Sequence, residues 1–125
     1  MLATKVFLAV VGVAYLALAL WCVILPERTS QSVGFTLKPG SGQSEYLVVY
    51  GGLQLGIALV FLWPLIRSTD PKEALFACLI IHGCIVAFRA LSFLRYSGIG
   101  STTYILAVVE WVLFLVSLGL WCRKA

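Results

Sequence analysis

Four long apolar stretches separated by shorter polar segments dominate the pattern of this chain. None of them shows the strict alternation of apolar and polar residues that is typical of a membrane β-strand, so each is predicted to be a helix. At 1.5 Å of rise per residue, about 20 helical residues cross a hydrocarbon core of about 30 Å, and all four stretches reach that length. The predicted helices cover residues 4–25, 45–66, 72–94 and 102–122.

The connections between these helices are short, except for residues 26–44, which are predicted to form a loop. A Pro-Gly-Ser-Gly run at 39–42 is typical of a turn. The loop either lies on the surface or dips into the membrane interface as a lid, through its apolar residues Val33, Phe35 and Leu37. Because little chain remains outside the apolar stretches, residues 1–125 are expected to form a single transmembrane domain, an all-α integral membrane four-helix bundle.

The composition and the charge agree with this class of protein. Hydrophobic residues make up 62% of the 125 residues and charged residues only 11%, and the mean hydropathy of +1.04 lies outside the range of ordinary soluble chains. The net charge of +4 forms no continuous basic patch. We therefore expect contact with lipid head groups and no nucleic-acid partner.

The distribution of Lys and Arg predicts an orientation in the membrane. Four crossings place both termini on one side, where the basic residues are Lys5, Arg67, Lys72, Arg123 and Lys124. The basic residues predicted on the opposite side are Arg28, Lys38 and Arg95. Because positively charged segments near membrane helices are retained in the cytoplasm, this excess favours cytoplasmic termini.

Three ionisable side chains lie inside the predicted helices: His82 and Arg89 in the third, and Glu110 in the fourth. A charge near the middle of a membrane helix costs roughly 2.5–3.5 kcal/mol, so such groups persist where they pair, face a wet cavity or have a function. Counted from the turn between the two helices, Arg89 lies roughly 8 Å deep and Glu110 roughly 12 Å deep. A long Arg side chain can bridge that difference, which predicts an Arg89–Glu110 ion pair. The pair either fixes helix register or lines a functional pocket.

His82 lies seven residues before Arg89, hence on the same helix face but deeper in the membrane. A buried histidine there is expected to be neutral and to hydrogen-bond to a facing carbonyl or to Gln54. Proton transfer and haem ligation are alternative roles, and haem ligation needs a ligand from another chain. The sequence has no residue spacing typical of a metal site, and it identifies no cofactor.

The second predicted helix carries a polar stripe in which Tyr46, Tyr50 and Gln54 recur every four residues. Glu45, Tyr46 and Tyr50 begin on the same side of the membrane as Arg89 and Glu110. The arrangement predicts a polar cluster that opens toward residues 26–44.

The same helix carries a G-x-x-x-G step on a different face, formed by Gly52 and Gly56. Two small residues one turn apart let another helix backbone approach closely. Since the motif is common in membrane helices, it indicates helix packing without saying which helix packs there. Packing within this protein and contact between copies in an oligomer both stay open.

The stretch Glu45 to Gly56, followed by Arg89 and Glu110, resembles an uncharacterised family of small four-helix bacterial membrane proteins that is distantly DoxX-like. The second helix of that family carries a Glu, an Arg two residues later, and then Tyr-Gly-Gly. This chain matches the Glu and the Tyr-Gly-Gly, but Leu47 stands in place of the Arg. The resemblance implies a four-helix bundle with a polar centre in the bacterial inner membrane. DoxX-like relatives include small membrane subunits of quinone-linked redox enzymes, which implies a lipophilic ligand or a place in a larger complex.

We expect a binding protein that holds a quinone or a lipid-like molecule in a polar intramembrane pocket, either by itself or as an accessory subunit of a larger membrane complex. The predicted ligand-binding residues are Tyr46, Tyr50, Gln54, His82, Arg89 and Glu110. One alternative is an oligomeric transporter or channel coupled to protons or cations, because four helices are few for a path within one chain. Another is a membrane isomerase that uses His82, Glu110 or Tyr50 for proton transfer.

Overall fold

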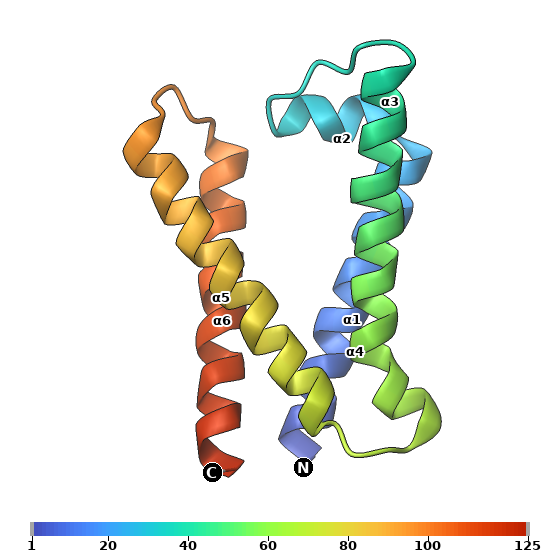
Figure 1. Ribbon diagram of the computed structural model, residues 1–125, viewed down its shortest axis with the longest axis vertical. Helices are drawn as coiled ribbons and strands as arrows, with labels where there is room; N and C mark the ends of the chain where they lie inside the picture. The colour runs from blue at the N-terminus through green and yellow to red at the C-terminus, as the bar shows by residue number, and fades with distance from the viewer. Residues whose placement is uncertain (1, 125) are drawn as a thin grey trace.

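The computed structural model describes residues 2–124, and these residues are helical apart from short connections, with no β-strand among them (Figure 1). The prediction of an all-α fold is confirmed. Four of the helices, with 23 to 27 residues each, are long and apolar enough to cross a membrane.

The helices in chain order are α1 (Leu2–Ile24), α2 (Pro26–Ser32), α3 (Ser41–Tyr46), η1 (Leu47–Leu53), α4 (Gln54–Arg67), α5 (Lys72–Arg95) and α6 (Ser101–Lys124). The segments α3, η1 and α4 form one continuous helix of 27 residues, in which η1 is wound as a π-helix. The long helices therefore match the predicted ones within a few residues at each end. The largest difference is at the second long helix, which begins at Ser41 instead of residue 45. There the Gly40 N–H donates to Gln43 Oε1 at 3.2 Å, so polar residues extend the helix beyond its apolar part.

The prediction of a loop over residues 26–44 is wrong in part, because this segment contains the short helix α2. Pro26 occupies the first turn of α2, where its fixed φ angle suits a helix and its missing N–H costs nothing. The Thr29 hydroxyl donates to the Leu25 carbonyl at 2.9 Å. The Tyr46 hydroxyl in turn donates to Thr29 Oγ1 at 2.8 Å and ties α2 to α3. This tertiary contact could not be read from the polar sequence of α2.

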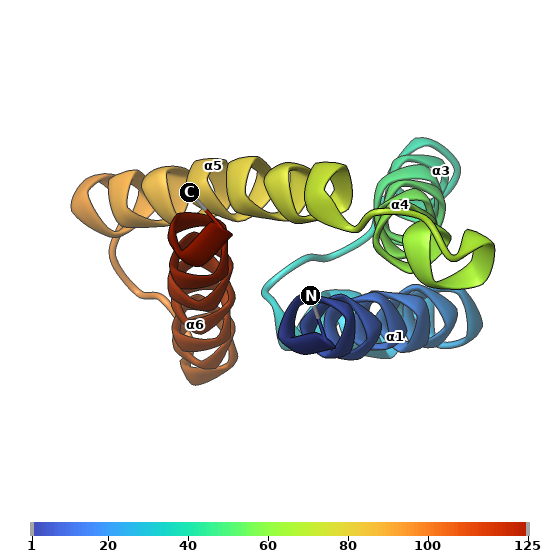
Figure 2. The same cartoon turned by 90° about the horizontal axis from the view of Figure 1, so that it is seen from below.

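The long helices form two antiparallel hairpins, α1 with the continuous α3–η1–α4 helix and α5 with α6 (Figures 1 and 2). The hairpins meet at the end of the molecule that carries both termini, and they diverge toward α2 and the α5–α6 turn. The apolar core lies at the closed end and consists of Leu8, Val11, Phe61, Ala74 and Cys78. The molecule is therefore an open arrangement of four helices, joined by apolar packing at one end only.

Close packing inside the first hairpin depends on two glycines. A Cβ atom added at Gly12 would lie 2.6 Å from Leu62 Cγ, and one added at Gly51 would lie 2.8 Å from Val23 Cγ2. Real Cβ atoms do not approach other carbons so closely, so α1 and the second long helix touch only because these positions have no side chain.

The predicted packing glycines, Gly52 and Gly56, are not the ones that pack. A Cβ atom added at either position would meet no atom within 4 Å. The interpretation of G-x-x-x-G as a contact within this protein is therefore wrong. A contact between copies at these two glycines stays a prediction.

Candidate functional site

The candidate site is built on the Arg89–Glu110 ion pair, which connects α5 to α6. Arg89 Nε donates to Glu110 Oε1 at 2.9 Å, and Nη2 donates to Oε2 at 2.7 Å. The pairing is bidentate, with both side chains mostly buried at 27% and 17% exposure. The ion pair predicted from the depth of the two residues is confirmed. Two parallel charge-assisted hydrogen bonds fix the plane of the guanidinium as well as its position.

Part of the Arg89 guanidinium stays free of protein partners. The group has five N–H bonds, and the pair with Glu110 uses one on Nε and one on Nη2. Among residues 2–124, Nη1 has no hydrogen-bond partner, and every fully buried side-chain nitrogen or oxygen has one. The Nη1 edge of the guanidinium is therefore accessible from outside the protein.

Arg89 is one of the residues that line a cavity of about 770 Å³ at the open end of the molecule. Its walls come from the end of α2, the end of α5, the turn at 96–100 and the start of α6. They include Gln31, Val33, Arg89, Ser92, Ile99 and Thr103. A volume of this order suits a small molecule or the head of a larger amphiphile. Val33, one of the predicted lid residues, forms part of the wall.

Tyr46 and Tyr50 have different roles, and neither is among the residues that line the cavity. Tyr46 is buried, and its hydroxyl is committed to Thr29, so it holds α2 in place. The Tyr50 ring stacks on Tyr46 with centroids 4.5 Å apart, and Phe35 packs edge-on against both. Phe35 therefore covers the two tyrosines and does not line the cavity. Its role is smaller than that of a lid over the cavity.

Gln54 is turned back onto its own helix. Its side-chain amide donates to the Tyr50 carbonyl at 2.6 Å, and it lies 3.9 Å from Cys22 Sγ. Gln54 does not line the cavity. The prediction that Gln54 binds a ligand stays a prediction.

His82 forms a separate, fully buried polar centre at the point where the two hairpins meet. Its Nδ1 lies 2.8 Å from the Cys78 carbonyl oxygen, which can only accept, so Nδ1 carries the proton of the neutral ring. Nε2 then accepts from the Tyr15 hydroxyl at 2.9 Å. Of the two predicted partners, the carbonyl is found, although it belongs to the helix of His82 itself, whereas Gln54 is wrong and Tyr15 takes its place. The signal that could have identified it is a lone tyrosine in the middle of the first apolar stretch.

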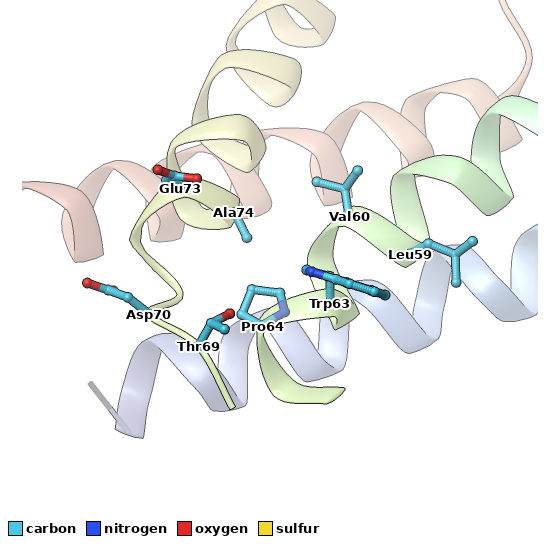
Figure 3. A pocket seen from close by; sticks show the side chains of 8 residues that line it. All are labelled: Leu59, Val60, Trp63, Pro64, Thr69, Asp70, Glu73 and Ala74. Atoms are coloured by element: carbon cyan, nitrogen blue, oxygen red, sulfur yellow. The ribbon is translucent and has the colours of Figure 1, made fainter. Parts of the chain in front are cut away.

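A second hollow of about 390 Å³ lies at the opposite end, in the α4–α5 turn (Figure 3). In Figure 3 the carboxylates of Asp70 and Glu73 lie on one side and the Trp63 ring on the other. Asp70 Oδ1 accepts from the Lys72 backbone N–H at 2.9 Å, and Glu73 lies in the first turn of α5. Both acids are thus accounted for by the start of a helix, where negative charge is favourable.

Within residues 2–124, no group of three or more His, Cys, Asp or Glu side chains is placed to hold a metal ion. The cavity beside Arg89 offers hydrogen-bond donors and apolar wall, and its lining contains no carboxylate and no histidine. This chemistry suits binding of a polar head group more than acid–base catalysis.

Comparison with known proteins identifies a family and no individual relative. No curated protein and no solved structure matches the chain. Residues 3–121 match the family described as domain of unknown function DUF4345. The expectation of an uncharacterised family is thereby confirmed, over nearly the whole chain. The chain belongs to the DUF4345 family of domains of unknown function.

Proposed function

We propose that this protein is a multi-pass integral membrane protein that binds a lipophilic molecule, quinone-like or lipid-like, in the cavity beside Arg89. Four apolar helices of membrane-spanning length support the membrane location. Both termini lie at one end of the molecule, and the excess of Lys and Arg at that end supports a cytoplasmic location for it. The bacterial inner membrane follows from the DoxX-like resemblance.

The observation that carries the proposal is the accessible edge of the Arg89 guanidinium at a cavity of ligand size. Inside a membrane, N–H groups without a partner are costly, so water or a ligand must satisfy them. A lipophilic molecule with a polar head could do so while its apolar part extends into the surrounding hydrocarbon.

A role as an accessory subunit of a larger membrane complex is the part of the proposal that rests on the DoxX-like resemblance. Such a subunit would hold the lipophilic molecule for a partner enzyme. Gly52 is exposed and Gly56 is half-buried, and a Cβ atom added at either would meet no atom within 4 Å, so the two glycines offer a surface on which another membrane helix could pack closely.

The two alternative functions have less support. A proton-coupled transporter needs a carboxylate that exchanges protons, whereas both oxygens of Glu110 accept hydrogen bonds from Arg89. A membrane isomerase needs an acid or base at its substrate, whereas His82 is fully buried and is absent from the cavity wall.

The proposal is tested by native mass spectrometry of the protein extracted with its surrounding membrane in polymer nanodiscs. We compare the wild type with the double variant Arg89→Gln/Glu110→Gln, which removes the guanidinium fork and its charge without leaving an unpaired charge. Arg95→Gln, at the exposed end of the same helix, is the matched control. A small-molecule adduct that is retained in wild type and Arg95→Gln but lost in the double variant supports the proposal. An adduct retained in the double variant, or no adduct in the wild type after loading with quinones and lipids, contradicts it.

A further inference from the structure

We infer that the molecule bound beside Arg89 is an amphiphile with an anionic oxygen head group, a carboxylate or a phosphate. This inference rests on the proposed binding function and names the class of its ligand. It follows from the shape of the free donors, from a second set of donors at the start of α6, and from the charges that line the cavity.

The first observation is the geometry of the free guanidinium edge. Glu110 occupies the side formed by Nε and Nη2. The other edge, between Nη1 and the second N–H of Nη2, is a fork of two parallel donors. Such a fork matches two oxygens of one carboxylate or phosphate, whereas a single carbonyl oxygen of a neutral head would use only part of it.

The second observation is the start of α6, which opens onto the same cavity through Gly100 and Thr103. In the described part of the chain, the first backbone bond of this helix is Tyr104 N–H to the Gly100 carbonyl, at 3.4 Å. The N–H groups of residues 101–103 therefore have no backbone acceptor. These donors and the positive end of the helix dipole favour an anion near the Arg89 fork.

The third observation concerns charge. Of the side chains that line the cavity, Arg89 is the one that carries a charge at neutral pH. Glu110 lies behind the guanidinium, on its other edge, and neutralises it in part. An anionic head would compete with Glu110 for the same cation, whereas a neutral head would not. Replacing Glu110 with Gln should therefore affect the two kinds of ligand differently, which gives the inference a specific test.

The test is a binding titration of the full chain in nanodiscs of phosphatidylcholine, with bound ligand counted by native mass spectrometry. The probes are dodecanoate, dodecyl phosphate, the neutral ester methyl dodecanoate, a short-chain quinone, and inorganic phosphate. We expect both anionic amphiphiles to bind about tenfold more tightly than the ester, because charge-assisted hydrogen bonds are about twice as strong as neutral ones. Inorganic phosphate alone should compete weakly, since it lacks the alkyl chain.

Two variants distinguish an anionic ligand from a neutral one. Glu110→Gln should tighten binding of dodecanoate severalfold and leave binding of the ester unchanged. Arg89→Gln should remove the preference for the anion, and Arg95→Gln should not. If Arg89→Gln does not fold, the wild type and Glu110→Gln still decide the question.

The outcomes separate this inference from the proposed function. If the ester or the quinone binds as tightly as the anionic amphiphiles, and if this binding is lost in Arg89→Gln, the ligand has no anionic head group. The proposed binding function would still stand. Binding of inorganic phosphate as tightly as dodecyl phosphate would overturn the amphiphile. The absence of binding for every probe would contradict the proposed function itself. If only one of the two anionic amphiphiles binds, that result assigns the head group as a carboxylate or as a phosphate.

Discussion

His82 is satisfied at both ring nitrogens by the protein itself. The carbonyl of Cys78, on the same helix, accepts from Nδ1, and the Tyr15 hydroxyl of α1 donates to Nε2. The centroids of the Phe61 ring and the imidazole lie 6.2 Å apart. These contacts connect the two hairpins just above the apolar core. The geometry gives His82 a structural role, because a histidine with both nitrogens bonded and no exposed surface is not available to a ligand.

Removing the Tyr15 hydroxyl should therefore destabilise the fold. Tyr15→Phe keeps the ring but leaves His82 Nε2 buried without a donor, which costs about 1–3 kcal/mol. The measurement is the free energy of unfolding in a mild detergent, taken from a reversible denaturation titration. Tyr104→Phe is the control, since Tyr104 is exposed and its ring keeps its stacking on Phe93. Equal stability of the two variants would show that the Tyr15–His82 bond does not hold the hairpins together.

At this scale, part of the site could be predicted from the sequence. Arg89 and Glu110 flank one short turn, so their depths could be compared directly, and the predicted pair exists. Tyr15 lies in α1, far from His82 in sequence, and no short turn fixes their relative height. Gln54 was a plausible partner by depth, but a local carbonyl at 2.6 Å satisfies it first.

At the scale of elements, the π-helical segment η1 explains why Gly51, and not Gly52, packs inside the first hairpin. A π-helix has more residues per turn than an α-helix, so the faces counted with a period of 3.6 residues drift over the seven residues of η1. The drift brings Gly51 against Val23 and leaves Gly52 in open space. The spacing of glycines could be read from the sequence, but the local winding of the helix could not.

Gly51 and Gly52 give a test with adjacent positions. Gly51→Ala should destabilise the first hairpin by about 1–3 kcal/mol, because the added methyl would overlap the stiff Val23 side chain. Gly52→Ala should be neutral or stabilise the helix slightly, since alanine has the higher helix propensity. Thermal unfolding of both variants in detergent measures the difference. If Gly52→Ala is the more harmful in detergent, the helix is wound differently from this structure. If it is neutral for unfolding but changes the subunit count, Gly52 contacts a second copy.

The ends of a helix could be predicted from composition only where the chain is apolar. The long helices could be predicted because hydrocarbon dictates their length and requires every backbone group to be bonded within the segment. Helix α2 has no apolar periodicity, and it is held by Pro26 and by the contact between Thr29 and Tyr46. Short polar helices of this kind depend on tertiary partners that a sequence pattern does not name.

On the scale of the whole molecule, the open end follows from where apolar and polar contacts lie between the hairpins. Apolar residues join them near the termini, while the opposite end carries the Arg89 cavity. The four helices could be predicted from the sequence, but not how the hairpins spread, because the hydropathy of a helix does not say which of its turns meets a neighbour. A ligand or a partner helix at the open end would complete the packing that the chain itself leaves unfinished.

Orientation in the membrane is also a property of the whole chain. On the terminal side, the Arg67 guanidinium lies 5.9 Å from the Trp63 ring centroid, and Lys72 Nζ lies 5.8 Å from that of Trp121. Tryptophan prefers the membrane interface, so in the proposed membrane location these pairs would hold two positive charges at the level of the lipid head groups. Green fluorescent protein fused to the C-terminus should therefore fluoresce in bacterial cells, and alkaline phosphatase fused there should be inactive.

The same argument predicts how the orientation can be disturbed. Replacing Arg67 and Lys72 with Gln leaves three basic residues on the terminal side, Lys5, Arg123 and Lys124, against three on the other. Because the difference in Lys and Arg determines orientation, this variant should insert in both directions and give both reporter signals. Arg95→Gln increases the difference and should keep the wild-type pattern. Phosphatase activity at the C-terminus of the wild type would place the termini outside the cytoplasm, and the Arg89 cavity would then open toward the cytoplasmic face.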